Sequence, residues 1–392
     1  MNSPLSVCHV VPNINTQSGG PAVSVPGLVD SLAAAGVETT LVTLNYARHG
    51  PQTALRRTRL VSMDAGPLTR MARGWKPSLQ AELGRIAGDG IELVHNHGLW
   101  MFPNRYARVT AHKGRMPLVT SPRGMLEPWS LQRSPLKKKL VWLLMEQANL
   151  RAAHGFHATS EQERLSIRRV GMKQPVAVIP NGLDSQPPSA PSVCDLHPQL
   201  KHKKWCLFLG RLHPKKGLDL LLQSWKAATV SPDWHLVIAG PDLTGYRPGL
   251  EAMIQQLGLT GSVSLVGMLD QPQKRSALAG ASLLVLPSHS ENFGIVVAEA
   301  LMAGVPAVAT TGTPWEVLEK TGAGWWIEAT IPALTRTLAS ATQLDSAELR
   351  RRGQAGKRYA EAEFAWDVVA RKMVAFYRFL LGRGEQPEFV EA

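Results

Sequence analysis

Several protein classes are excluded by what this chain has little of. Its 392 residues include only three cysteines, Cys8, Cys194 and Cys206, which are widely spaced and odd in number. They fit neither a disulfide framework nor a zinc site, so we expect buried thiols in a reducing cytoplasm. A membrane-spanning helix needs a run of about 18 apolar residues, and none is present. The start, MNSPLSVCHVVPNIN, has no basic leader and no long apolar core, so no secretory signal is expected.

Acidic residues are also scarce. The chain has 43 Lys and Arg against 30 Asp and Glu, a formal net charge of +13. Such an excess suits nucleic acid, an anionic membrane surface or an anionic substrate, and a basic surface that only aids solubility is the remaining alternative. Zinc-finger spacing, an RNP-like aromatic segment and basic repeats are all missing, so no nucleic acid is expected as a partner.

Short apolar runs alternate with helical patterns through most of the chain. This alternation predicts parallel βαβ units, and therefore an α/β fold of two Rossmann-like domains facing one another across a cleft. We expect the domains at 1–184 and 205–364, a linker rich in Pro and Ser at 185–204, and a long helix over about 365–381. The expected strands are 6–12, 39–44, 91–97, 116–122, 155–160 and 176–184 in the first domain, and 205–210, 234–240, 262–267, 281–288 and 305–311 in the second.

A basic loop follows the first strand of the second domain. In FLGRLHPKKGLDLL, Arg211, Lys215 and Lys216 stand between that strand and a helix. Cations beside the free backbone N–H groups of a helix N-terminus form a site for an anion such as phosphate. A solvated basic turn is the alternative.

Two glutamates mark the stretch 289–318. Glu299 lies in the apolar run IVVAEALMA, where burial of an unpaired carboxylate is costly, so it needs a hydrogen-bonding partner or a cleft. Glu291 precedes it by eight residues, about 12 Å along a helix, which suits two ends of an extended ligand better than an acid/base pair. Gly294 allows the backbone of 293–295 close to a ligand. A satisfied structural glutamate is the alternative for Glu299.

The first domain offers weaker signals. Gly19 and Gly20 follow its first strand and could bring backbone close to a phosphate or sugar, but they do not form a GxGxxG fingerprint. His97 ends the strand at 91–97 and is expected at the cleft, where it could bind a sugar hydroxyl; a core or surface histidine is the alternative. In SPLKKKLVWLLMEQANLRAA (134–153) we expect a helix with a buried apolar face and exposed lysines, which could rest on an anionic leaflet.

The order of three motifs resembles the retaining glycosyltransferases of family 4, which have the GT-B architecture. The motifs are PNGLD (180–184), GRLHPKKGLD (210–219) and SENFGIVVAEALMAGVPAVAT (290–310). The resemblance covers essentially the whole chain. It implies that the first domain binds the acceptor, that the second binds a nucleotide diphosphate sugar, UDP- or GDP-linked, and that the helix at 365–381 packs back on the first domain through aromatic core residues.

The resemblance also implies roles in the second domain. Arg211 and Lys216 resemble the pair that neutralises the donor diphosphate, and Glu291 the acid that meets the hydroxyls of the donor sugar. The backbone of Phe293, Gly294 and Ile295 resembles the part that cradles sugar and phosphate. Glu299 resembles the carboxylate that accepts from the ribose hydroxyls. Its partner is then expected to be the ligand.

Further positions are matched less closely. Gly19 and Gly20 resemble the glycine loop of the family's first domain, and His97 its sugar-proximal histidine, so that His97, Glu291, Arg211 and Lys216 are the implied residues of the reaction centre. Met268 and Leu269 fall where members contact the base through backbone groups. Many members have a histidine where this chain has Arg123, in MPLVTSPRGMLEPW (116–129). That version resembles a subgroup of polysaccharide and lipopolysaccharide assembly.

The implied activity is transfer of a sugar to a saccharide or lipid-linked acceptor with retention, without metal or cofactor. The chain has no DxD motif in a plausible metal-binding loop. Arg123 and Glu127 could contact the acceptor; a structural salt bridge is the alternative for Arg123. The expected location is the cytoplasm, with peripheral association at the inner membrane face. Two other functions stay open: a sugar-nucleotide epimerase of GT-B fold, and a non-catalytic protein that binds anionic lipid or nucleic acid.

Overall fold

The structure is a computed structural model that describes residues 4–132, 139–184, 197 and 200–392. The chain divides into two compact units, residues 1–182 with 366–392, and residues 183–365. Most of the expected linker at 185–204 lies outside the described residues. Its last residues belong to the second unit, because Leu200 is buried in that unit's core and Lys204 begins strand β8.

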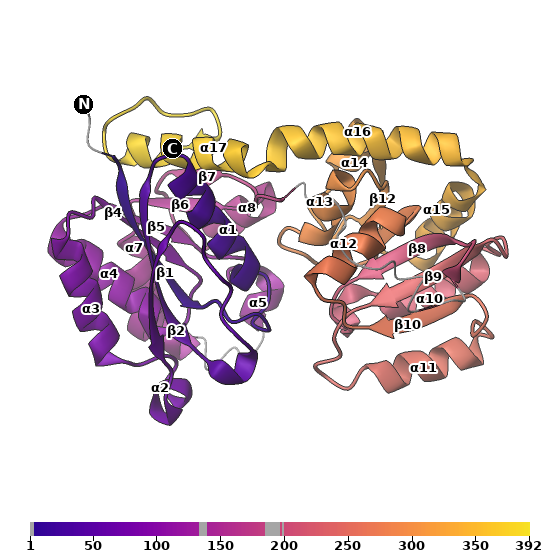
Figure 1. Cartoon of the computed structure of the whole chain (residues 1–392), viewed down its shortest axis with the longest axis horizontal. Coiled ribbons are helices and arrows are strands. Elements are labelled where there is room, and N and C mark those ends of the chain that lie inside the picture. The colour runs from indigo at the N-terminus through magenta and orange to yellow at the C-terminus, as the bar shows by residue number, and fades with distance from the viewer. Residues whose placement is uncertain (1–3, 133–138, 185–196, 198–199) are drawn as a thin grey trace. The chain divides into compact units, whose positions relative to one another are not determined.

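The first unit is built on an eight-stranded sheet in the order β14-β7-β6-β5-β4-β1-β2-β3 (Figure 1). Strands β1 to β7 are parallel, and β14 pairs antiparallel with β7. The strands are β1 Ser6–Asn13, β2 Glu38–Asn45, β3 Arg59–Asp64, β4 Leu93–His97, β5 Leu118–Ser121, β6 Gly155–Ala158, β7 Val176–Val178 and β14 Val390–Glu391.

Helices cover both faces of this sheet, as a parallel sheet requires. Neighbouring residues of β1 point to opposite faces: Val7 packs in a cluster with α1 and α17, whereas Cys8 packs in a cluster with α3 and α4. The helices are α1 Pro21–Ala34, α2 Pro67–Met71, α3 Pro77–Gly88, α4 Phe102–Gly114, α5 Pro128–Gln132, α7 Gln147–Arg151, α8 Glu161–Arg169 and α17 Trp366–Leu380, with a 3₁₀ turn at Ala47–His49 and a π-helical turn at Trp142–Glu146.

Helix α17 packs on the first unit, across α1 (Figure 1). Its Phe376 and Tyr377 are fully buried, as the sequence predicts. The indole of Trp366 fills a space that two glycines leave open, since a Cβ at Gly27 or Gly182 would lie 2.1 Å from one of its ring carbons. Small residues at these two positions therefore allow the close approach of α17.

The second unit contains a six-stranded parallel sheet in the order β10-β9-β8-β11-β12-β13. Its strands are β8 Lys204–Leu209, β9 Trp234–Ala239, β10 Val263–Gly267, β11 Leu283–Leu286, β12 Ala307–Thr310 and β13 Gly324–Ile327. Its helices are α10 Leu218–Ala227, α11 Arg247–Gln256, α12 Gln271–Gly280, α13 Ile295–Met302, α14 Val317–Lys320, α15 Ile331–Gln343 and α16 Ser346–Phe364, with a 3₁₀ turn at Pro214–Lys216.

The prediction of a buried apolar face for 134–153 is wrong in part, and residues 133–138 lie outside the described residues. Met145 and Leu150 are buried, but the side chains of Leu140, Leu143 and Leu144 are 59%, 62% and 76% exposed. The sequence could not separate the two sets because a π-helical turn interrupts the helical period here. Among the described residues, no helix is both long and apolar enough to cross a membrane.

Candidate functional site

Loops of the second unit gather at one edge of its sheet. All six strands are parallel, so the loops that follow β8, β9, β10, β11 and β12 leave from the same, carboxyl edge. Three of these loops carry the residues that the sequence singled out: 210–217 after β8, 268–270 after β10 and 287–294 after β11.

The loops after β8 and β11 are in direct backbone contact. Gly217 has a φ of +65°, and a Cβ there would lie 2.2 Å from the carbonyl oxygen of Pro287. The amide of His289 donates to the carbonyl of Lys215 at 2.9 Å. Only glycine satisfies both the left-handed backbone and the close approach at position 217. The two loops therefore form one surface.

An ion pair joins the same two loops. Lys216 Nζ contacts Glu291 Oε1, which also accepts a hydrogen bond from Ser288 Oγ at 2.8 Å. The two charged side chains are only 17% and 14% exposed. The amide of Glu291 donates to the carbonyl of Gly312 at 2.8 Å, which ties in the loop after β12. The structure thus brings Lys216 and Glu291 together, 75 residues apart in sequence.

Helix α13 begins beside this pair. Gly294 precedes its first residue in the left-handed conformation, with φ +69°. The carbonyl of Phe293 accepts from Trp315 Nε1 at 2.6 Å, which fixes the turn. The first N–H groups of a helix have no acceptor within the helix, and together with Lys216 they offer an anion a cation and aligned dipoles. This arrangement can hold a phosphate group.

Glu299 has a protein partner, which differs from the expectation that its partner is a ligand. Lys274 Nζ, from α12, donates to Glu299 Oε1 at 2.7 Å, and the carboxylate side chain is 19% exposed. Lys274 is not predicted as this partner from the sequence, because nothing in QPQKRSAL relates it to a residue 25 positions later. A ribose hydroxyl would have to share or replace this contact.

The remaining predicted residues of this unit are more open. Arg211 is exposed and has no ion-pair partner within 4 Å among the described residues. The side chain of Met268 is 66% exposed, and that of Leu269 is partly buried. These three residues keep their side chains available to a ligand at the carboxyl edge of the sheet.

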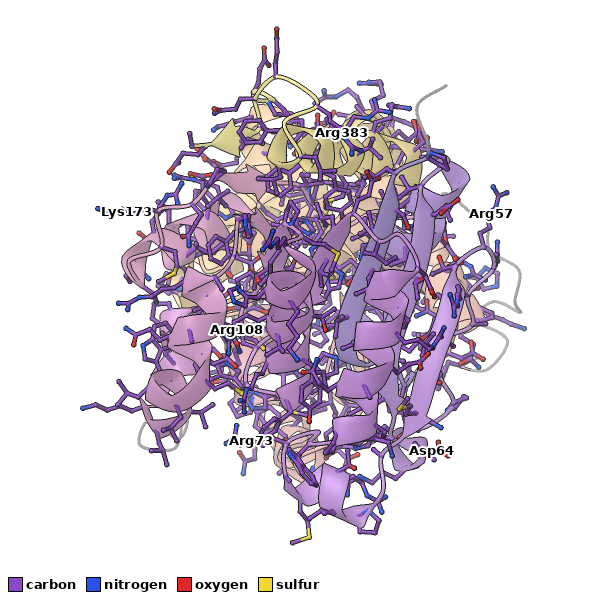
Figure 2. All side chains as sticks on the ribbon, turned by 90° about the vertical axis from the view of Figure 1, so that its left-hand side faces the viewer. Arg57, Asp64, Arg73, Arg108, Lys173 and Arg383 are labelled. Carbon is purple, nitrogen blue, oxygen red and sulfur yellow. The ribbon has the colours of Figure 1, made fainter. Side chains whose placement is uncertain are left out.

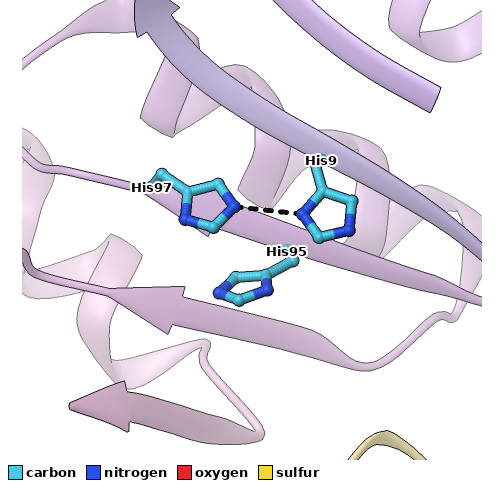
Figure 3. A group of neighbouring side chains, drawn as sticks. All are labelled: His9, His95 and His97. Carbon is cyan, nitrogen blue, oxygen red and sulfur yellow. Dashed lines mark hydrogen bonds between the residues drawn. The ribbon is translucent and has the colours of Figure 1, made fainter. Parts of the chain in front are cut away.

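In the first unit, His97 is buried, which differs from the expectation of a histidine open to a cleft. It is 0% exposed, and both of its ring nitrogens are engaged. Arg123 Nη2 lies 3.1 Å from Nδ1, and His9 Nδ1 lies 3.0 Å from Nε2 (Figure 3). A guanidinium can only donate, so Nδ1 of His97 accepts and its Nε2–H donates to His9.

A second chain of hydrogen bonds runs beside the first and fixes two more tautomers. His157 Nε2 must donate to the carbonyl of Ile179 at 2.8 Å, so its Nδ1 accepts from Ser121 Oγ at 2.9 Å. Ser121 then accepts from His95 Nε2 at 2.7 Å, and His95 Nδ1 accepts from the Tyr377 hydroxyl at 2.6 Å. This relay links α17 to β4, β5 and the segment after β7.

The histidine cluster is a poor metal site. The metal-binding atoms of His9, His95 and His97 lie within 4.8 Å of one another, which is close enough for an ion. Five of the six ring nitrogens already make hydrogen bonds, the exception being His9 Nε2. The nearest charge is the cation of Arg123, which would repel a metal ion. The donor set therefore suits a network of neutral rings.

Arg123 takes its position from its neighbours. Its backbone is left-handed, with φ +56°, and its Nη1 donates to Asn181 Oδ1 at 2.8 Å. The next amide, of Gly124, donates to Glu163 Oε1 at 2.6 Å, which fixes the loop. Burial lowers the pKa of Arg123 to about 10, partly offset by the charge of Glu163, so it is still a cation at neutral pH. Among the described residues no carboxylate lies within 4 Å of it, so the expected alternative of a structural salt bridge is not formed.

The other predicted residues of the first unit differ in exposure. Glu127 is 6% exposed, so its side chain is not open to an acceptor. Gly19, with φ +97°, and Gly20 are exposed at the start of α1, and no atom lies within 4 Å of a Cβ built on either. The glycine loop thus leaves bare backbone at the carboxyl end of β1.

Comparison with known proteins gives the same two-unit picture. Residues 19–182 match the family described as glycosyl transferase 4-like domain, and residues 197–359 match glycosyl transferases group 1. D-inositol 3-phosphate glycosyltransferase of Segniliparus rotundus is 27% identical over 370 residues, 88% of this chain and 76% of that protein.

Two solved structures are similar over nearly their whole length. Sucrose-phosphate synthase from Thermosynechococcus elongatus has a TM-score of 0.77 at 21% identity, covering 96% of this chain and 99% of that one. Anabaena HepE, in complex with UDP and glucose, has a TM-score of 0.72 at 18% identity, covering 94% and 98%. The two Rossmann-like sheets and these matches define the GT-B fold. The chain belongs to glycosyltransferase family 4.

Because of the buried histidines, we expect the free energy of unfolding of the first unit to fall at acid pH. Burial, the largest cause, lowers the pKa of His9 and His157 to about 3 and those of His95 and His97 well below their usual value. The unfolded chain takes up these protons near pH 6.5 and the folded chain does not. Stability is therefore complete above about pH 6.5 and falls as the pH drops, by up to about 1.4 kcal/mol per pH unit for each histidine.

Urea unfolding of the first unit between about pH 7.5 and about pH 5.5 measures this loss. His9→Gln should reduce the pH slope by up to about 1.4 kcal/mol per pH unit. Exposed His112 is the matched control, and His112→Gln should leave the slope unchanged. Equal stability at both ends of the pH range would show that these rings are protonated in the folded protein.

Proposed function

We propose that this enzyme transfers a sugar from a nucleoside diphosphate sugar to an acceptor with retention of configuration and without a metal ion. The observation that carries the proposal is the Lys216–Glu291 pair, which joins two loops directly beside the N-terminus of α13. A cation and a helix N-terminus meet the charge of a diphosphate, and a carboxylate beside them can accept from sugar hydroxyls.

The reaction would use charges that are fixed before the substrate arrives. Lys216 and Arg211, with the amides of Phe293, Gly294 and Ile295, would stabilise the departing nucleoside diphosphate. The acceptor oxygen would bond to the anomeric carbon on the face that the phosphate leaves, and a phosphate oxygen would take the acceptor proton. No protein nucleophile is needed. Glu291 would orient the sugar, and Glu299 would share the ribose with Lys274.

The donor base is proposed to be uracil. Support comes from the similar Anabaena protein, which was solved with UDP and glucose. The base would lie against the backbone at Met268 and Leu269, after β10, where the Met268 side chain is exposed and Leu269 is partly buried.

A thermal-shift screen against UDP, GDP, ADP and CMP, with and without magnesium, tests the donor site. UDP should raise the melting temperature without magnesium, because a ligand that binds only the folded state stabilises it. Arg211→Ala and Glu299→Gln should lose most of the shift. The matched controls are Arg350→Ala, an exposed arginine of the same unit, and Glu316→Gln, which breaks an exposed ion pair with Lys320. Loss of the shift in the controls as well, or dependence on magnesium, would contradict the assignment.

We propose that the acceptor is a saccharide or polyol that carries a phosphate, free or lipid-linked, and that Arg123 binds this phosphate. Arg123 is a cation with no carboxylate within 4 Å among the described residues, and His97 and Asn181 hold its guanidinium in one orientation. The names of two similar proteins support a phosphorylated acceptor: one is a D-inositol 3-phosphate glycosyltransferase, the other a sucrose-phosphate synthase.

The acceptor proposal predicts a change in KM. Arg123→Gln should raise KM for inositol phosphate roughly 10- to 100-fold, the loss expected for a charge-assisted hydrogen bond, and leave KM for the donor unchanged. Arg115→Gln is the matched control, since Arg115 is also left-handed but exposed. An equal rise in KM for inositol without a phosphate would show that Arg123 does not recognise the phosphate. If the protein isomerised the donor sugar with no acceptor present, the proposed transferase activity would be wrong and the epimerase alternative would take its place.

We also propose that the enzyme works at the anionic inner face of the cytoplasmic membrane, in assembly of a cell-surface polysaccharide or lipopolysaccharide. The net charge of +13 supports an anionic surface as partner. The PRGM segment at 122–125 supports the pathway class, because it resembles the subgroup of those enzymes.

A further inference from the structure

Two turns of the first unit expose large apolar side chains. In α2, Leu68 is 62% and Met71 is 85% exposed. In the second turn, at residues 139–144, Leu140, Leu143 and Leu144 are 59%, 62% and 76% exposed. Single exposed apolar residues are ordinary on protein surfaces, but these form clusters within five residues of sequence.

The two turns are bonded to the same residue. Trp100 donates its amide to Glu146 Oε1 at 2.9 Å and accepts from Arg73 Nη1 at 3.4 Å. Its ring also lies 6.2 Å from that of Trp142. Arg73 follows α2 and lies at the lower end of the first unit in Figure 2. The exposed turns therefore flank Trp100, three residues after His97, at the carboxyl edge of the sheet.

The leucines are held outward. Met145 and Glu146 are buried on the inner side of the same turn, and Asn149, one helical turn later, accepts from Arg108 Nε at 2.9 Å. Rolling the helix to bury Leu143 and Leu144 would break these contacts and expose a carboxylate that is 0% exposed. The apolar exposure is thus a property of the packed fold.

The exposed charges within these two segments are basic. Between positions 67 and 76 the sequence has no carboxylate, and Arg70 and Arg73 are exposed. Between positions 139 and 151 the one carboxylate, Glu146, is buried, whereas Lys139 and Arg151 are exposed.

A basic hollow lies at the far end of the second turn's helix. Arg151 and Lys173 line a hollow of about 520 Å³ that has no carboxylate in its lining. Arg151 follows Leu144 by seven residues, which is about 10 Å along a helix. This separation suits an apolar side chain below the headgroups of a bilayer and a cation at its phosphates.

We propose that α2 and the turn at 139–144 are the surface by which the first unit docks on an anionic phospholipid bilayer. Exposed apolar side chains with exposed cations in the same segments suit the interface of such a membrane, where the apolar groups reach the acyl chains and the cations reach the phosphates. The docking surface specifies how the enzyme would contact the membrane, and this inference rests on the membrane location proposed above. Docking there brings the carboxyl edge of the sheet, with His97 and Arg123, to the leaflet that presents a lipid-linked acceptor.

Co-sedimentation of the full chain with vesicles tests the surface. We expect binding to vesicles of phosphatidylcholine mixed with phosphatidylglycerol, weaker binding to phosphatidylcholine alone, and weaker binding at high salt. Leu143→Glu with Leu144→Glu, and separately Met71→Glu, should each lower the affinity roughly tenfold or more. Leu243→Glu is the matched control, because Leu243 is 66% exposed but belongs to the second unit, and it should bind as the parent does.

Three outcomes would overturn the proposal: a parent that does not sediment with anionic vesicles, variants that bind as well as the parent, or a parent dimer in solution that Leu143→Glu with Leu144→Glu makes monomeric. The last would assign the surface to a second copy of the chain. The UDP thermal shift, measured on the same preparations without lipid, reports separately on the donor site. A failed docking surface is then distinguishable from a failed transferase assignment.

Discussion

The hydrogen-bonded relay from Tyr377 through His95, Ser121 and His157 to the carbonyl of Ile179 is the interaction on which the first unit's site depends. It ties a helix near the C-terminus to strands formed nearly 300 residues earlier, since Tyr377 and His95 are separated by 282 residues. Each ring of the relay has one nitrogen that donates and one that accepts, so these rings are neutral. Beside the relay, Arg123 donates to His97, and His97 must therefore donate to His9. The charge of this hydrogen-bonded cluster is therefore that of the Arg123 guanidinium.

In the second unit, the corresponding groups are two pairs of oppositely charged side chains. Lys216 and Glu291 hold two loops together, and Lys274 and Glu299 do so for α12 and α13. Both pairs are mostly buried, so each charge has a partner before a donor arrives, and this partner offsets part of the cost of taking the charge out of water. In the proposed reaction, a donor would exchange these contacts for contacts with its own phosphates and hydroxyls. Charges placed in this way would stabilise the leaving group without any movement of the backbone.

The sequence predicted the alternation of strands and helices, because buried parallel strands are continuous apolar runs. It also singled out the loops at 210–217 and 287–294, which the structure brings into contact. It missed β3, β13 and β14, which lie at sheet edges and are short or partly exposed. It also missed the roles of Lys274, Asn181, His9, His95 and His157, because these partners meet only through the tertiary fold; for His97, a core histidine was the stated alternative. Histidines at 9, 95, 97 and 157, all within expected strands, were the available signal for the relay. The exposure of Leu143 and Leu144 could not be read from period alone, because a π-helical turn changes the phase.

In the proposed enzyme, Lys216 binds the diphosphate of the donor and Glu291 binds its sugar. Isothermal titration of UDP into the parent, Lys216→Ala and Glu291→Gln tests this most directly. Lys216→Ala should weaken UDP binding roughly tenfold or more, because it removes the cation at the helix N-terminus. Glu291→Gln should keep or improve UDP affinity, since a neutral amide no longer competes for the Lys216 ammonium, while transfer is lost. Unchanged UDP affinity in Lys216→Ala, or an equal loss in both variants, would contradict the account.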